Sequence, residues 1–263
     1  MMRDIQIGSP DLPDLRSKAQ FTLLRQWLKD CDEEHHQSCA TMEHADIEAD
    51  TKVRKIPTRL IEVGDDGSPL VRLYETGSGF DGEWVALSHR WGPNPHFETT
   101  TDNLESHREG LVFEDLPATF KDAVEVTRAL GCGYLWIDSI CIVQKGPKAD
   151  FNSEAKRMEY VYSGARCVIA ATCANGHYEG FLKKREKRRY VGLRTERGPD
   201  ASFYICDAID DFQKHVLDGP MNKRGWVLQE HALARRTIFF DDHQVYWECG
   251  YGVRCETMNT LRK

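Results

Sequence analysis

Residues 134–144, YLWIDSICIVQ, form a nearly unbroken apolar run that holds one carboxylate, Asp138. A strand that is apolar on both faces must be covered on both sides, which is typical of the centre of a parallel sheet with helices on each face. We therefore expect residues 134–144 to form such a central strand. Its acid either makes structural hydrogen bonds or lies at a site where the strand ends.

The flanking segments alternate between helical and strand patterns, which favours an α/β fold with a mostly parallel sheet flanked by helices and extended by extra β-hairpin and strand additions. The expected helices are residues 14–31, 117–130, 152–165 and 224–236, and the expected strands, besides 134–144, are a hairpin over 58–75 and residues 84–88, 166–172, 237–241 and 244–249. Residues 1–13 are expected to be a loose N-terminus and residues 14–263 a single domain.

Composition limits the class of protein. The net charge of −7 argues against nucleic acid as a general partner, and no apolar run approaches the ~20 residues that span a bilayer. The N-terminus lacks the apolar core of a signal peptide. The nine cysteines are odd in number and several lie in apolar runs, a pattern of buried, reduced thiols. These features indicate a cytoplasmic protein, in which the basic run at residues 183–189 is a solvated loop rather than a phosphate-binding patch.

Polar side chains follow several of the predicted strands. Because ligands of open α/β sheets bind at the carboxyl ends of the parallel strands, these side chains are the candidates for a site. They offer a carboxylate, a cation, a hydroxyl and two indole rings, which suit a polar ligand with a flat ring. The residues are Ser88, Arg90 and Trp91 after one strand, Asp138 in the central run, and Trp226 and Glu230, four apart on one helix face.

Each of these residues also has a structural explanation. Ser88 is equally explained as a turn residue, and Arg90 as the partner of a carboxylate that holds its loop. Asp138 is readily explained as a helix cap or loop anchor. Tryptophans such as Trp91 and Trp226 are more often core residues than stacking platforms, and most helical glutamates are solvent-exposed.

Cysteine and histidine spacing after the first helix raises the question of zinc. Cys31, His35 and Cys39 fall at i, i+4 and i+8 of a continuous helix, and Cys249 or Cys255 would have to supply a fourth ligand. Positions i and i+8 lie about 12 Å apart along a helix axis, too far for one ion unless the helix ends between them. In that case His36 would be the better partner of Cys39. The sequence alone therefore assigns no metal ligand.

Three blocks, WVALSHRWG, GYLWIDSICIVQ with the following E…M…VYSGA, and RGWVLQE, together resemble the fungal heterokaryon incompatibility (HET) domain. The upstream W…C…H…C and IPTRLIEV segments extend the resemblance over residues 20–256. The chain departs from the family after Gln144, where it has KGPKADFNSEAKRM in place of acidic residues and a tryptophan.

The resemblance implies a module that triggers cell death when unlike fungal cells fuse, or in related innate immunity. The HET domain is in turn distantly similar to TIR domains, which implies a TIR-like (flavodoxin-like) fold. In that comparison WVLQE matches the TIR segment whose glutamate is catalytic in NAD-cleaving members, so Glu230 takes the catalytic role. Ser88, Arg90 and Trp91 become candidates for the nucleotide pocket, with Trp226 stacking on a ring and Asp138 orienting Arg90 or a loop amide.

Two functions remain open at this point. One is an enzyme with NAD⁺ or a related nucleotide as substrate, without a bound cofactor, that self-associates for activity. The other is an adaptor that triggers cell death by assembling and performs no chemistry. An allelic or regulatory protein is an expected partner of either. A third, weaker alternative is a zinc-stabilised regulatory domain.

Overall fold

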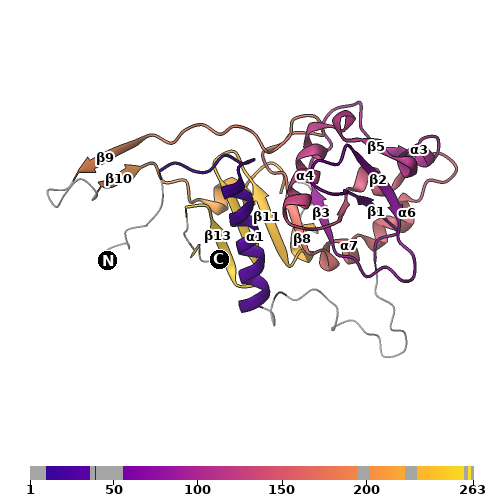
Figure 1. The fold of residues 1–263 in the computed structure, drawn as a ribbon, viewed down its shortest axis with the longest axis horizontal. Coiled ribbons are helices and arrows are strands. Elements are labelled where there is room, and N and C mark those ends of the chain that lie inside the picture. The colour runs from indigo at the N-terminus through magenta and orange to yellow at the C-terminus, as the bar shows by residue number, and fades with distance from the viewer. Residues whose placement is uncertain are drawn as a thin grey trace.

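The computed structural model describes residues 10–35, 39, 56–194, 202–222, 230–257 and 260–261. A ten-stranded mixed sheet runs through the molecule in the order β14-β13-β12-β11-β8-β3-β6-β1-β2-β5 (Figure 1). None of the described helices is both long enough and apolar enough to cross a membrane.

Four parallel strands form the centre of the sheet. They are β11 (Arg236–Phe240), β8 (Cys167–Ala170), β3 (Trp84–Ser88) and β6 (Tyr134–Trp136). Every residue of β3, β8 and β11 is buried, as expected for strands covered on both faces. The prediction of an α/β sheet with a parallel centre is confirmed.

Antiparallel strands extend the sheet on both sides. Next to β6 lie β1 (Arg59–Glu62), β2 (Leu70–Glu75) and β5 (Leu111–Val112). Next to β11 lie β12 (Val245–Cys249), β13 (Gly252–Cys255) and β14 (Thr260–Leu261). The predicted hairpin over residues 58–75 is therefore confirmed as β1 and β2.

The apolar run at residues 134–144 is not one strand, and this part of the prediction is wrong. After β6 the chain forms a helical turn, α5 (Asp138–Cys141), and then β7 (Val143–Lys145), which pairs with β4 (Thr99–Thr100) in a separate sheet. Ile140, Cys141 and Ile142 are each about as buried as the strand itself. Because the apolar side chains from Leu135 to Val143 are all buried, hydrophobicity cannot separate strand from buried helix here.

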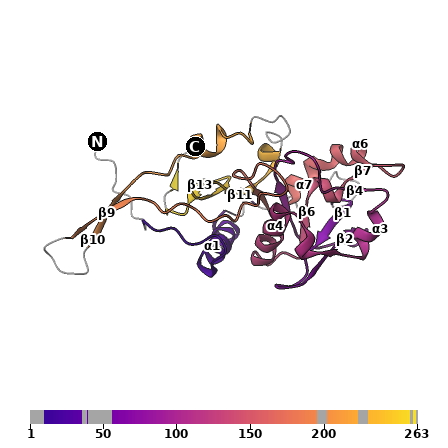
Figure 2. The ribbon, with the colours of Figure 1, turned by 90° about the horizontal axis from the view of Figure 1, so that it is seen from above.

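Helices cover both faces of the sheet (Figure 2). On one face lie α1 (Lys18–Glu34) and α4 (Ala118–Ala129), and on the other α6 (Phe151–Glu154), α7 (Met158–Gly164) and the π-helical turn η3 (Gln213–Leu217). Apolar spacing predicts a stripe of Phe21, Leu24, Trp27 and Leu28 on α1, of which the last three are buried and Phe21 is partly buried. The helix expected over residues 152–165 is interrupted by a 3-10 turn, η2 (Ala155–Arg157). Two further short helices are α3 (Leu104–Glu109) and η1 (Phe113–Asp115).

A two-stranded ribbon, β9 (Tyr190–Arg194) and β10 (Ser202–Cys206), extends away from the main sheet (Figures 1 and 2). It forms a sheet of its own. A ribbon of two strands buries little apolar surface by itself.

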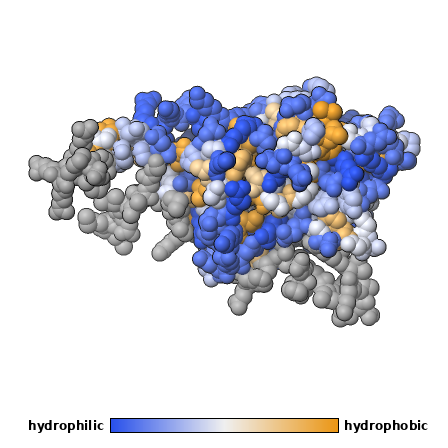
Figure 3. All heavy atoms as spheres, in the orientation of Figure 1, coloured by the Kyte–Doolittle hydropathy of each residue, from blue (hydrophilic) through white to orange (hydrophobic). Residues whose placement is uncertain are grey.

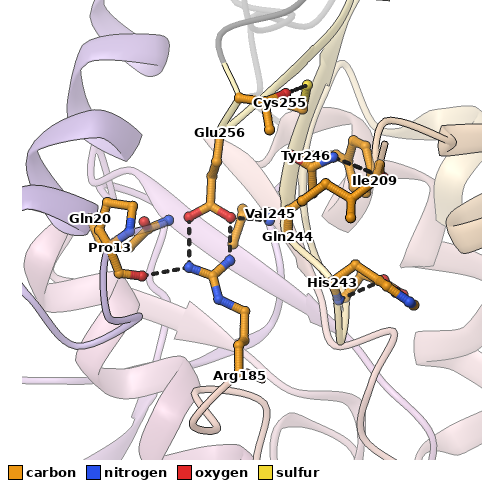
Figure 4. A network of polar contacts seen from close by, with 12 residues as sticks. Pro13, Gln20, Arg185, Ile209, His243, Gln244, Val245, Tyr246, Cys255 and Glu256 are labelled. Carbon is orange, nitrogen blue, oxygen red and sulfur yellow. Dashed lines mark hydrogen bonds and ion pairs between the residues drawn. The ribbon is translucent and has the colours of Figure 1, made fainter. Parts of the chain in front are cut away.

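The basic run at residues 183–189 is not simply a solvated loop, which corrects the prediction. Arg185 lies between Glu256 and the carbonyl of Pro13 (Figure 4). The Glu256 side chain is fully buried and also accepts a hydrogen bond from the backbone N–H of Val245, at 2.6 Å. The run therefore contributes a buried ion pair that joins the N-terminal segment to the strands β12 and β13.

Candidate functional site

Ser88 and Glu230 meet at the carboxyl end of β3. Ser88 pairs in register with Ala170, and Ala170 with Phe239, so these side chains point to one face of the sheet. A helical turn at residues 230–233 covers this face, since the His231 ring packs edge-on against Phe239 at 5.3 Å. Glu230 is thereby placed over the end of β3, where the Ser88 hydroxyl donates a hydrogen bond to its Oε2.

Burial makes this contact unusual for a helical glutamate. Ser88 is 3% exposed and Glu230 8%, although most carboxylates stay in water. A buried carboxylate needs hydrogen bonds, and the Ser88 hydroxyl supplies one. Next along the turn, His231 Nε2 contacts the carboxylate of Glu248, so this stretch of chain is held to the sheet by two polar contacts.

Arg90 lies at a cavity on the same edge of the sheet. Its Nε donates to the carbonyl of Ala174 at 2.9 Å and its Nη2 to that of Thr172 at 3.4 Å. It holds the loop through these carbonyls, where the sequence suggested a carboxylate. The cavity has a volume of about 170 Å³ and is lined by residues that follow β3, β8 and β11, among them Asp241 and Asp242. Glu230 is not among the described residues that line it.

Asp138 holds Trp91. Its Oδ2 accepts a hydrogen bond from Trp91 Nε1 at 2.7 Å, and its Oδ1 accepts one from the backbone N–H of Ser139 at 2.7 Å. The recorded hydrogen bonds of Asp138 therefore go to Trp91 and to the adjacent amide of Ser139, while Arg90 bonds to the carbonyls instead. The acid in the apolar run lies just after β6 and fixes the indole that follows β3.

His96 and His177 pack against Trp91, and His89 packs against His177; sequence reasoning missed this cluster. His177 lies with its ring centroid 5.1 Å from His89, 5.6 Å from His96 and 5.6 Å from Trp91. His177 lies about 80 residues after the segment that holds His89 and His96, so no sequence spacing links it to them. His177 Nδ1 accepts a hydrogen bond from the backbone N–H of Phe97, so its Nε2 carries the proton of the neutral ring. Burial, with the neighbouring histidines His89 and His96, lowers the pKa of His177 to about 4.

Acid is expected to weaken the fold through His177. Its pKa is lower in the folded chain than the ordinary value of about 6.5, so the unfolded chain binds the extra proton between pH 6.5 and 4. The free energy of unfolding should be greatest above pH 6.5 and fall by about 1–3 kcal/mol as the pH drops to 4. Urea unfolding across this range measures the fall.

The variant His177→Asn isolates this contribution, because an amide oxygen replaces the acceptor Nδ1 but does not titrate. Burial also lowers the pKa of His107, which contributes in the same pH range in both proteins. The variant should therefore show a smaller fall than the parent. An unchanged fall would mean that His177 is not the group that titrates.

A second group, His215, Asp241 and His243, gathers donor atoms beside the cavity. The rings of His215 and His243 stack at 4.0 Å with an angle of 2° between them. A metal ion lies in the plane of each imidazole that binds it, so two parallel stacked rings do not share one ion. These residues are therefore a stacked pair with an aspartate, and His243 Nδ1 lies 2.9 Å from Asp241.

The structure thus brings most of the predicted site residues to one edge of the sheet. Ser88, Arg90, Trp91, Asp138 and Glu230 all lie at or just after the carboxyl ends of β3 and β6 or over them. Trp226 lies outside the described residues, so its position beside Glu230 stays a prediction. The arrangement defines an α/β protein with its polar residues gathered at the carboxyl edge of the parallel strands.

The family model of the heterokaryon incompatibility protein (HET) matches residues 84–230, more than half of the 263 residues. The chain therefore belongs to the HET family, which indicates a role in heterokaryon incompatibility. The match begins at the first residue of β3 and ends at Glu230. No curated protein and no solved structure matches the chain.

Proposed function

We propose that this HET protein triggers cell death by hydrolysing NAD⁺ at the bond between nicotinamide and ribose, with Glu230 as the catalytic residue. The observation that carries the proposal is the buried contact between Glu230 and Ser88 at the carboxyl end of β3. This is the edge where open α/β sheets bind their ligands. The resemblance of WVLQE to the TIR glutamate segment supports the same residue.

The reaction suits a single carboxylate. The bond between ribose C1′ and the pyridinium nitrogen breaks, and its electron pair leaves with nicotinamide, which departs neutral without a general acid. The ribose passes through an oxocarbenium-like state, as in glycoside hydrolysis. Water then adds to C1′ and loses a proton to give ADP-ribose. Glu230 stabilises the developing positive charge or holds the ribose hydroxyls, and Ser88 orients its carboxylate.

The cavity beside Arg90 suits part of such a ligand. Its volume of about 170 Å³ is below the roughly 300–1,000 Å³ of pockets that hold whole drug-sized ligands, so it has room for a ring or a sugar. Asp241 and Asp242 in its lining repel phosphates but favour ribose hydroxyls and the cationic pyridinium ring. Trp91, half-buried and held by Asp138, offers a flat face for stacking.

Nicotinamide release by the purified protein tests the proposal. The protein is incubated with NAD⁺ at low and at high protein concentration, and nicotinamide and ADP-ribose are quantified by chromatography. Equal amounts of the two products, formed faster per chain at high protein concentration, would support a self-associating hydrolase. Intact NAD⁺ at every protein concentration would contradict the hydrolase for this nucleotide.

A second candidate function is assembly without chemistry, which the ribbon of β9 and β10 favours. Register places Val191 and Leu193 on the same face as Ile205. All three are highly exposed, Val191 and Ile205 at 62% each. Figure 3 shows apolar surface at the ribbon, set apart from the body of the protein. An apolar ribbon with open strand edges is suited to pairing with a second copy of the chain.

Charged residues introduced into the ribbon are expected to weaken self-association of the chain. In the double variant Val191→Lys and Ile205→Lys, each lysine removes about 1.5–3 kcal/mol of apolar burial, so the dimer dissociation constant should rise at least ~10-fold for each substitution. Sedimentation measurements over a range of concentrations give this constant.

Phe151→Lys is the matched control, because Phe151 is an exposed apolar residue of α6 away from the ribbon. It should associate like the parent protein. A parent protein that is monomeric throughout, or a double variant that associates as the parent does, would contradict assembly through the ribbon.

A further inference from the structure

Four metal-binding side chains meet at the end of α1. They are Cys31, His35, Cys39 and Cys249, all buried, and one donor atom from each lies within 4.8 Å of the others. α1 ends at Glu34, so the chain is not a continuous helix from Cys31 to Cys39. The objection that positions i and i+8 lie too far apart therefore does not hold. His35 belongs to the cluster, while His36 lies outside the described residues.

The measured separation of two donors fits one shared ion. Cys249 Sγ lies 3.6 Å from His35 Nδ1. Donors bound to one zinc ion, at about 2.3 Å for sulfur and about 2.0–2.1 Å for nitrogen, lie about 3.5–3.6 Å apart at the tetrahedral angle. Three sulfurs and one imidazole are a common ligand set for structural zinc.

The surroundings hold the donors in this arrangement. The turn between β12 and β13 lies against the sulfurs, with the backbone of Gly250 beside Cys39 and that of Tyr251 beside Cys249. The Tyr251 ring stacks on His35 at 3.9 Å with an angle of 4°. Contacts of this kind to sulfur and to the ligating histidine typically orient the ligands of a metal.

Charge also favours a divalent cation. Three thiolates and a neutral imidazole carry a charge of −3, which zinc reduces to −1. Arg236, 3% exposed, lies near Cys31 and pairs with Asp32 at 2.8 Å. Its Nε and Nη1 are buried and have no hydrogen-bond partner among the described residues. A buried guanidinium with free donors is placed to balance the remaining negative charge.

We propose that Cys31, His35, Cys39 and Cys249 bind one structural zinc ion. All four positions of the tetrahedron are taken by the protein, which is the arrangement of a structural rather than a catalytic zinc. Cys249 pairs with Arg236 at the amino end of β11, whereas Glu230 contacts Ser88 at the carboxyl end of β3, so the two sites are separate. The ion fastens the end of α1 to the turn between β12 and β13, joining segments more than 200 residues apart.

Metal analysis of the purified protein tests the proposal. The protein, expressed without a histidine tag in zinc-containing medium, should contain one zinc per chain by mass spectrometry. Replacement of zinc by cobalt should give the intense visible absorption of tetrahedral cobalt together with thiolate charge-transfer bands. Cys249→Ser should lose the metal and melt at a lower temperature than the parent protein.

Cys255→Ser is the matched control, since Cys255 is equally buried in the adjacent strand β13 but outside the cluster. It should retain one zinc per chain. If Cys249→Ser does not fold, the cobalt spectrum of the parent protein decides. A parent protein without stoichiometric metal, a disulfide between Cys31 and Cys249, or full metal content in Cys249→Ser would each overturn the proposal.

Discussion

The variant Glu230→Gln is expected to lower the rate of NAD⁺ cleavage by a factor on the order of 10²–10³ or more while leaving the fold intact. Glutamine has the shape of glutamate and its amide oxygen still accepts the hydrogen bond from Ser88. It lacks the negative charge that stabilises the oxocarbenium-like ribose. The rate constant at saturating NAD⁺, measured as nicotinamide release, should therefore fall with little change in melting temperature.

Two further variants test whether the loss of activity is specific to the charge of Glu230. Ser88→Ala should give a smaller loss, because it removes one hydrogen bond that orients the carboxylate but keeps the charge. Glu154→Gln is the matched control, since Glu154 is an equally buried glutamate that pairs with Thr58, beside β1 rather than at the end of β3. It should keep full activity. If Glu230→Gln cleaves NAD⁺ as fast as the parent protein, Glu230 is not the catalytic residue.

Glu256→Ala is expected to lower the free energy of unfolding by about 3–5 kcal/mol, the usual cost of removing one partner from a buried ion pair. Arg185 would lose its carboxylate in a site where its own side chain is only 10% exposed. The backbone N–H of Val245 would lose its acceptor as well (Figure 4). Chemical denaturation followed by circular dichroism measures the change.

Neighbours in the same basic run provide the control. Lys184→Ala and Lys187→Ala remove exposed cations and should change stability by less than about 0.5 kcal/mol. The double variant Arg185→Met with Glu256→Leu should recover much of the loss, because an apolar pair leaves no buried charge. Equal effects of Lys187→Ala and Glu256→Ala would show that the ion pair does not stabilise the fold.

The sequence by itself determined the local elements whose pattern has a clear period. The stripe of α1, the hairpin of β1 and β2, the buried strand β3 and the helix α4 all follow from apolar spacing and from the turn residues between them. The order of these elements also determined the parallel centre of the sheet. Because ligands collect at the carboxyl ends of parallel strands, Ser88 and Glu230 could be named as one site before their contact was seen.

The tertiary structure decided the features that depend on contacts between segments distant in the sequence. Apolar periodicity indicates which residues are buried, and the strand β6 and the helical turn α5 are equally buried. The apolar pattern therefore gave no signal for the break after Trp136. The pattern of seven residues rich in lysine and arginine predicts a solvated loop. The structure shows instead that Arg185 pairs with Glu256, which comes from a distant part of the chain. Likewise, the sequence left open whether Cys249 or Cys255 would join Cys31, His35 and Cys39, and the fold decided this by placing Cys249 against the end of α1.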